Sequence, residues 1–124
     1  MLSGQVFIEP LQESELSLVR SWRNHEAIRS FMFDQEFITE DSHFEWFKRS
    51  QSNALKTLLI CKTLEGTPIG FLQFDKLSVD SDVYEWGFYV APGSEAGTGQ
   101  IMLRAGLDFA FKQMQALKVF GRVL

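Results

Sequence analysis

Cysteine, histidine and positive charge are all scarce in this sequence. The chain contains one cysteine, Cys61, and two histidines. A single thiol cannot build a disulfide framework or a thiolate zinc cluster, so we expect a reduced, cytoplasmic protein with no metal centre. Lysine and arginine number 12 against 16 aspartate and glutamate residues, and the net charge is -4. A general nucleic-acid-binding surface needs clustered basic residues, so we expect no nucleic-acid partner.

Long apolar runs are absent as well. No segment approaches the ~18 consecutive apolar residues that cross a bilayer, and Met1 to Gln5 lacks the apolar core of a signal peptide. We therefore expect no membrane partner. Hydrophobic residues nevertheless make up 45% of the chain and aromatic residues 14%, which suffices for one core. The composition thus predicts a single domain over residues 1–124.

The stretch from Val83 to Gln100 combines a strand, a glycine-bearing loop and the start of a helix. An apolar strand ends at Val90, the loop 93–99 follows Ala91-Pro92, and an apolar helical pattern begins near Gln100. Backbone N–H groups at a helix start lie at the positive end of the helix dipole and bind phosphate well. The stretch predicts a phosphate-binding turn, although glycines also serve ordinary tight turns.

The hydrophobic periods along the rest of the chain predict an α/β fold. Helical spacing joins Leu16 to Val19 and Leu18 to Trp22, and Thr39 is a good N-cap for a helix over residues 40–50. The other predicted elements are a short helical stretch at 26–32, a helix at 99–115, and strands at 6–8, 57–61, 69–74, 83–90 and 118–124. A strand, crossover helix and strand imply a parallel pair. We therefore expect a central mixed sheet flanked by helices.

The last predicted strand, residues 118–124, is apolar and ends the sequence. An unpaired hydrophobic edge strand favours association. We expect either that further chain follows it or that a second copy covers it in a homodimer.

These elements, with the Gly97-Thr98-Gly99 turn, resemble the N-terminal and central parts of the GCN5-related N-acetyltransferase (GNAT) fold. Within that superfamily, Trp22-Arg23-Asn24, Ile28-Arg29, Met32, Ile38, His43 and Trp46-Phe47 are most similar to the pseudaminic-acid pathway enzymes. Those enzymes transfer acetyl from acetyl-CoA to the 4-amino group of a UDP-linked 4-amino-4,6-dideoxy sugar. The resemblance implies the same activity, a nucleotide-sugar acceptor, and an incomplete fold that stops after its fifth strand.

The resemblance also implies where acetyl-CoA binds. The family signature is Arg or Gln, two residues, Gly, one residue, then Gly or Ala; here Ser94 takes the first position, and Glu95 adds a negative charge beside the pyrophosphate. In the family the strand splays near residues 88–90, so that unpaired N–H groups meet the pantetheine amides and the thioester. The expected cofactor-binding residues are Phe88, Tyr89, Val90, Ser94, Glu95, Ala96, Gly97, Thr98, Gly99 and Gln100.

Acetyl transfer to an amine needs an unprotonated nucleophile, an aligned thioester and donors for the oxyanion. Strand alternation puts Glu85, Gly87 and Tyr89 on one face, opposite Tyr84, Trp86, Phe88 and Val90. Glu85 is the carboxylate best placed to accept the ammonium proton, and Gly87 leaves space for an acceptor. A solvated or arginine-paired carboxylate is the plainer alternative for Glu85. The group that protonates the leaving thiolate is expected beyond Leu124.

The residues that the resemblance assigns to acceptor binding are Trp22, Arg23, Arg29, Met32, His43, Phe47 and Tyr84. Arg23 and Arg29 suit a diphosphate, yet such arginines also occur in surface ion pairs. His43 can instead pack on its own helix, and Trp22, Phe44 and Phe47 also fit a core.

Two other functions stay open from the sequence. One is a protein N-acetyltransferase of the ribosomal alanine type, whose N-terminal half has a similar organisation. The other is an inactive CoA-binding or structural fragment.

Overall fold

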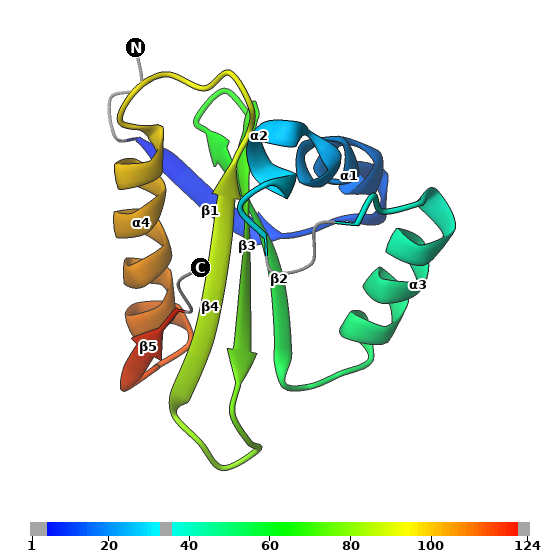
Figure 1. The fold of residues 1–124 in the computed structure, drawn as a ribbon. Coiled ribbons are helices and arrows are strands. Elements are labelled where there is room, and N and C mark those ends of the chain that lie inside the picture. The colour runs from blue at the N-terminus through cyan, green and yellow to red at the C-terminus, as the bar shows by residue number, and fades with distance from the viewer. Residues whose placement is uncertain (1–4, 33–35, 122–124) are drawn as a thin grey trace.

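The computed structural model describes residues 5–32 and 36–121. Its five strands form one sheet in the order β1-β2-β3-β4-β5, with antiparallel pairing except between β4 and β5, which are parallel (Figure 1). The strands are β1 Val6–Pro10, β2 Lys56–Thr63, β3 Pro68–Lys76, β4 Val83–Val90 and β5 Lys118–Phe120. The predicted mixed sheet is confirmed. Residues 122–124 of the predicted last strand lie outside the described residues.

Helices cover both faces of this sheet (Figure 1). One face carries α1 Leu16–Asn24, α2 Glu26–Arg29 and α3 Glu40–Gln51, and the other carries α4 Thr98–Asp108. No helix in the described ranges is long and apolar enough to cross a membrane.

Local side-chain chemistry explains where α3 begins and ends. The Thr39 side-chain oxygen accepts a hydrogen bond from the Ser42 N–H at 3.2 Å, which confirms the predicted N-cap. Acidic residues occupy the first turn and Lys48 and Arg49 the last, so both ends complement the helix dipole.

The helix predicted over residues 99–115 is shorter in the structure. After α4 the chain widens into a π-helical turn, Phe109–Gln113, in which the Met114 N–H donates to the Phe109 carbonyl at 3.1 Å. Gln115 then adopts a left-handed backbone conformation with φ 57°. Apolar periodicity continued through this segment, but it does not distinguish an α-helical turn from a wider one.

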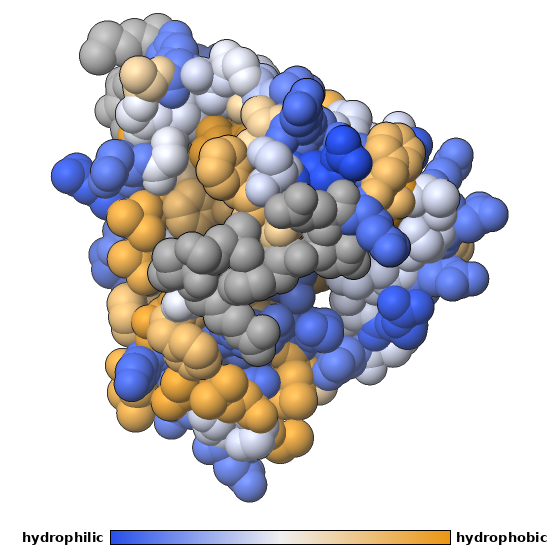
Figure 2. Space-filling view, viewed as in Figure 1, coloured by the Kyte–Doolittle hydropathy of each residue, from blue (hydrophilic) through white to orange (hydrophobic). Residues whose placement is uncertain are grey.

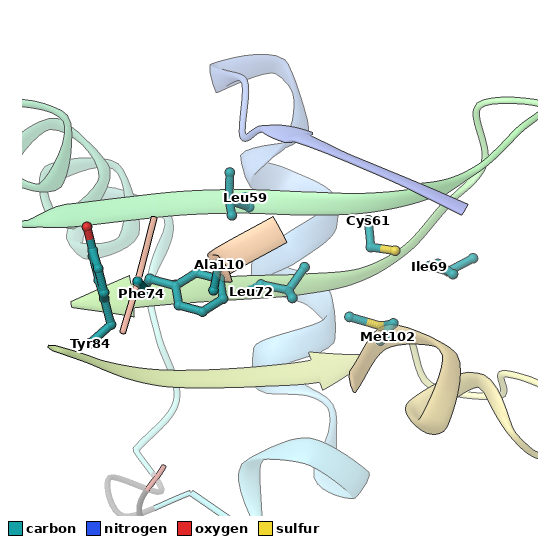
Figure 3. Close-up of a cluster of buried hydrophobic side chains, with 9 residues drawn as sticks. Leu59, Cys61, Ile69, Leu72, Phe74, Tyr84, Met102 and Ala110 are labelled. Atoms are coloured by element: carbon teal, nitrogen blue, oxygen red, sulfur yellow. The ribbon is translucent and has the colours of Figure 1, made fainter. Parts of the chain in front are cut away.

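Each face of the sheet has its own apolar core. Figure 3 shows the core beneath α4, which includes Leu59, Cys61, Ile69, Leu72, Phe74, Tyr84, Met102 and Ala110. The core beneath α1 and α3 contains Leu11, Leu16, Val19, Trp22, Phe47, Ile60 and Phe71. Phe44, expected to pack inside, is instead 41% exposed, and the Lys48 ammonium lies 5.2 Å from its ring centre.

Apolar surface gathers at the lower left of Figure 2, at the end of the molecule where the β3–β4 turn and β5 lie in Figure 1. The exposed large apolar residues of these segments are Leu77, Val79, Leu117 and Phe120. A homodimer that covers β5 stays a prediction.

A glycine brings α4 close to the sheet. A Cβ atom at Gly106 would lie 2.7 Å from Cζ3 of Trp86 and 2.8 Å from Cδ2 of Leu72. Both distances are shorter than van der Waals contact, and both neighbours are packed in the core. Gly106 therefore sets how closely the helix lies over β3 and β4.

His43 is a buried polar residue, 5% exposed, in the first half of α3. Its ring stacks on Trp46 with centroids 4.8 Å apart. Burial, together with the positive charges of Arg20 and Arg23, lowers the pKa of His43 to about 4. The imidazole is therefore neutral at pH 7.

Replacing Gly106 with alanine should destabilise the fold. Overpacking a core typically costs ~1–3 kcal/mol, whereas alanine in place of glycine favours a helix by ~1 kcal/mol, so we expect a net loss of about 1 kcal/mol. Gly99→Ala is the matched control, because a Cβ at Gly99 meets Val90 at 3.9 Å, an ordinary contact. Urea unfolding measures both variants. Equal stabilisation of the two variants would contradict the close packing at Gly106.

Stability should fall with pH between about 6.5 and 4 because of His43. Between these pH values the unfolded chain binds a proton at His43 that the folded chain does not. The contribution of His43 to the free energy of unfolding is therefore complete above the unfolded pKa, and up to about 3 kcal/mol of it is lost on acidification through the folded pKa. His43→Gln should flatten this dependence in urea unfolding at pH 7 and pH 5. His25→Asn is the control, because asparagine preserves the capping acceptor that His25 provides. An unchanged slope in His43→Gln would refute the assignment.

Candidate active site

The backbone of β4 presents alternate residues to its two neighbouring strands. The Ala91 N–H donates to the Ile69 carbonyl at 2.8 Å, and Tyr89 lies opposite Phe71 in the same register. In an antiparallel ladder, every second residue exchanges hydrogen bonds with the neighbouring strand. The N–H groups of Phe88 and Val90 therefore point away from β3, toward the β5 side.

On that side, β5 accompanies only the beginning of β4. The described residues pair Val83 with Lys118, Tyr84 with Val119 and Glu85 with Phe120, and Figure 1 shows β5 beside the lower half of β4. The outward N–H groups of Phe88 and Val90 thus lie where β5 is not paired in the described chain. This is the place where the family resemblance implies a splayed strand.

The loop after β4 leads into the N-terminus of α4. Gly93 and Gly97 have left-handed backbone conformations, with φ 80° and 92°, and a Cβ at either would meet nothing within 4 Å. The Thr98 hydroxyl donates to the Glu95 carbonyl at 2.7 Å, and the Ser94 hydroxyl donates back to the Ala91 carbonyl. These two side chains form hydrogen bonds within the segment 91–98, so the exposed surface of the loop consists largely of backbone.

This loop suits an anionic group. The first N–H groups of a helix have no intrahelical acceptor, and those of Gly99 and Gln100 occupy the first turn of α4. Their partial positive charge favours a phosphate. Ser94 points back to the strand and adds no donor toward an anion, and Glu95 adds an exposed negative charge. The residues fit the pyrophosphate of CoA through the backbone rather than through a basic side chain.

A cavity of about 690 Å³ lies on the face of the sheet that carries α1 and α3. It is bounded by β3 and β4, by the C-terminal end of α1 and by α3. Its charged and polar side chains are Arg23, Ser42, His43, Gln73, Asp75 and Glu85. Its apolar and aromatic residues are Phe31, Met32, Ile38, Trp46, Phe71, Trp86, Phe88 and Tyr89, with Gly87 between them. The volume is within the range of small-molecule sites.

Two carboxylates share the β3–β4 wall of this cavity. Asp75 lies directly opposite Glu85 in the strand register, and both line the cavity. The Asp75 carboxylate accepts hydrogen bonds from Lys56 Nζ at 3.1 Å and from Gln73 Nε2 at 3.0 Å. Lys56 thus offsets one of two adjacent negative charges.

Aromatic rings form a continuous wall beside the carboxylates. His43 stacks on Trp46, Trp46 meets Phe71 edge-on at 6.0 Å, and Phe71 lies 5.2 Å from Tyr89. Burial raises the pKa of Tyr89, so its phenol stays neutral at ordinary pH. A Cβ at Gly87 would meet nothing within 4 Å, which leaves open space next to Glu85.

The structure places some of the predicted site residues at the cavity and others in the two cores. Glu85, Phe88, Tyr89, Arg23, Met32 and His43 line the cavity. Trp22 and Phe47 are core residues, 7% and 1% exposed, and Tyr84 packs edge-on to Phe74 on the opposite face of the sheet. Large apolar side chains on a helix or an inner strand can face the core as readily as a pocket, and these three are packed in the core. Arg29 ends α2 outside the lining.

Several lining residues were not identified from the sequence. Gln73 and Asp75 follow the alternation of β3, and only the register with β4 places them beside Glu85. Ile38 and Trp46 belong to the segment that carries the resemblance, yet no chemical feature of theirs indicates a cavity. No cluster of three or more potential metal-ligating side chains occurs in the part of the chain that the structure describes.

Two ligands can reach β4 from different sides. The loop 91–97 and the part of the β4 edge that the described residues leave unpaired lie on the side of the outward amides, while Glu85, Gly87 and Tyr89 face the cavity. A thioester aligned with Phe88 and Val90 would have its carbonyl near backbone donors. An amine in the cavity would have a carboxylate within the same wall.

Known proteins resemble the chain in sequence. The model of the acetyltransferase (GNAT) domain matches residues 5–124. Among curated proteins, the acetyltransferase PseH of Campylobacter jejuni is 28% identical over 105 residues, which are 85% of this chain and 64% of PseH. The chain therefore spans less than two thirds of that relative's length.

Solved structures resemble the chain in fold. A spermidine N-acetyltransferase from Vibrio cholerae, crystallised with CoA and spermine, matches 98% of this chain and 72% of its own, with TM-score 0.87 and 16% identity. The aminoglycoside acetyltransferase AAC(6')-Ib, crystallised with ribostamycin and coenzyme A, matches 96% of this chain and 74% of its own, with TM-score 0.77 and 20% identity. Because the family model covers nearly the whole sequence, the chain belongs to the acetyltransferase (GNAT) domain family.

Proposed function

We propose that this chain carries the acetyl-CoA-dependent N-acetyltransferase activity that the GNAT family implies, with the 4-amino group of a nucleotide-linked amino sugar as acceptor. The observation that carries the proposal is the position of Glu85, which lines a cavity of small-molecule size on β4. Residues 86–90 of this strand have no β5 partner within the described residues. The sequence resemblance to the pseudaminic-acid pathway enzymes supports the amino-sugar acceptor, and the similarity to the acetyltransferase PseH supports acetyl transfer. Acetyl-CoA and nucleotide sugars are cytoplasmic metabolites, and we propose the cytoplasm as the site of action.

Acetyl-CoA supplies an acetyl group activated as a thioester. We assign its pyrophosphate to the N–H groups at the start of α4, because the glycines at 93, 97 and 99 leave the backbone accessible there. The outward amides of Phe88 and Val90 would hold the pantetheine arm, and either could donate to the thioester oxygen. Preorganised donors of this kind stabilise the oxyanion of a tetrahedral intermediate.

Glu85 would accept the proton of the acceptor ammonium, directly or through a water molecule, so that the free amine could attack the thioester carbonyl. Collapse of the tetrahedral intermediate would then break the C–S bond, leaving the acetylated amine and the thiolate of CoA, which is protonated on release. Gly87 provides the space for the approach. The neutral rings of His43, Trp46 and Tyr89 offer apolar faces and polar tips to a sugar ring. Arg23 lines the same cavity, and we assign a phosphate of the nucleotide to its guanidinium.

A polyamine is the second candidate acceptor. Asp75 and Glu85 on one wall attract cationic amines, and an aromatic wall stands beside them. The ion pair of Asp75 with Lys56 reduces this attraction, so we place the amino sugar first.

The proposal is tested by acetyl-CoA binding and by turnover. Calorimetry should detect acetyl-CoA binding, and a thiol-release assay should show faster turnover with a UDP-linked 4-amino-4,6-dideoxy sugar than with spermidine or with a peptide that begins with alanine. Preference for spermidine would establish the second candidate, and preference for the peptide a protein acetyltransferase. Acetyl-CoA binding with no turnover of any of the three acceptors would overturn the enzymatic function for this chain.

Glu85→Gln should lower the acetylation rate most at low pH, where the amine acceptor is protonated and needs a base. General-base catalysis typically contributes ~100-fold or more, while the acetyl-CoA affinity should stay near that of the wild type because Glu85 faces the cavity. Asp75→Asn is the matched carboxylate-to-amide control across the strand pair. Rate measurements between pH 6 and 9 decide, and a pH profile that Glu85→Gln leaves unchanged would remove Glu85 as the base.

A further inference from the structure

Asn24, the last residue of α1, holds a backbone position 14 residues further along the chain. Its Nδ2 donates to the Ile38 carbonyl at 2.7 Å, and its Oδ1 accepts the Ile38 N–H at 2.6 Å. A side-chain amide has a donor and an acceptor side by side, so it pairs with the N–H and the carbonyl of one residue as a neighbouring strand does. Both hydrogen bonds are partly shielded from solvent.

Ile38 is a wall residue of the cavity that contains Glu85. The next residue, Thr39, caps α3, and Ser42 and His43 on the first turns of α3 line the same cavity. The position of Ile38 thus determines how far the start of α3 lies from the end of α1. Arg23, adjacent to Asn24, lines the cavity from that helix.

We propose that Asn24 is a positioning residue for the acceptor, acting through Ile38 to fix the width of the cavity between α1 and α3. The inference rests on the proposed function, because it assumes that this cavity receives the amine. Asn24 is not one of the residues that line the cavity. Its influence is therefore expected on acceptor binding, separate from the cofactor loop at the other end of β4.

Other side chains at this position leave the Ile38 peptide unit without one or both partners. Leucine or alanine removes both hydrogen bonds, and aspartate replaces the donor with an oxygen that repels the Ile38 carbonyl. A partly buried peptide group without a partner is costly, so the chain around Ile38 shifts toward water. The start of α3 then loses its fixed distance from Arg23.

The test compares Asn24→Ala with Asn53→Ala. Asn53 also holds a backbone N–H, that of Leu55 at 2.9 Å, but it lies in the turn between α3 and β2 and is not part of the cavity lining. We expect Asn24→Ala to raise the KM for the UDP-linked amino sugar about five- to tenfold, with kcat within about twofold and the KM for acetyl-CoA unchanged. Asn53→Ala should leave all three at wild-type values.

Hydrogen exchange of the Ile38 amide provides a readout that does not depend on turnover. Its protection should be lost in Asn24→Ala and retained in Asn53→Ala, while amides of β3 keep their protection in both variants. An unchanged acceptor KM, or an Ile38 amide that stays protected in Asn24→Ala, would overturn the inference. If the wild type acetylates none of the acceptors, the proposed function fails, and the Ile38 exchange result alone decides whether Asn24 positions the cavity wall.

Discussion

The two-residue alternation of β4 is the constraint on which the site depends. Odd-numbered residues hydrogen bond to β3 and send their side chains into the cavity, whereas even-numbered residues direct their amides to the β5 side and their side chains under α4. A shift of the register by one residue would bury Glu85 beneath α4 and take its carboxylate away from the cavity. The aromatic packing under α4 therefore also holds the carboxylate in place.

Both cores contribute to this arrangement in different ways. The approach of Gly106 to Trp86 and Leu72 presses α4 onto the sheet and brings its N-terminus to the end of β4. On the opposite face, Trp22 and Phe47 fill the space beneath α1 and α3, and the cavity lies beside this packed region. Trp46, next to Phe47 in the sequence, lies in the cavity wall because adjacent helical residues point about 100° apart.

Local signals made the strands, the cap of α3 and the two faces of β4 predictable from the sequence. Residues whose role depends on distant partners were not predictable. Asp75 joins the site through a cross-strand register, and Asn24 acts on a segment far along the chain. The resemblance assigns Trp22, Phe47 and Tyr84 to acceptor binding, but aromatic character does not reveal which face of an element is buried, and all three lie in the cores. The sequence likewise does not reveal the direction of the Ser94 side chain, whose hydroxyl donates to the Ala91 carbonyl.

The burial of Cys61 has a consequence for the kinetic mechanism. It is the only cysteine of the chain, it is fully buried under α4, and burial raises its thiol pKa to about 11. A thiolate that could accept an acetyl group from the donor is therefore not accessible. An acetyl transfer of the proposed kind would therefore not pass through a thioester on Cys61, and the acceptor amine would take the acetyl group from the donor directly.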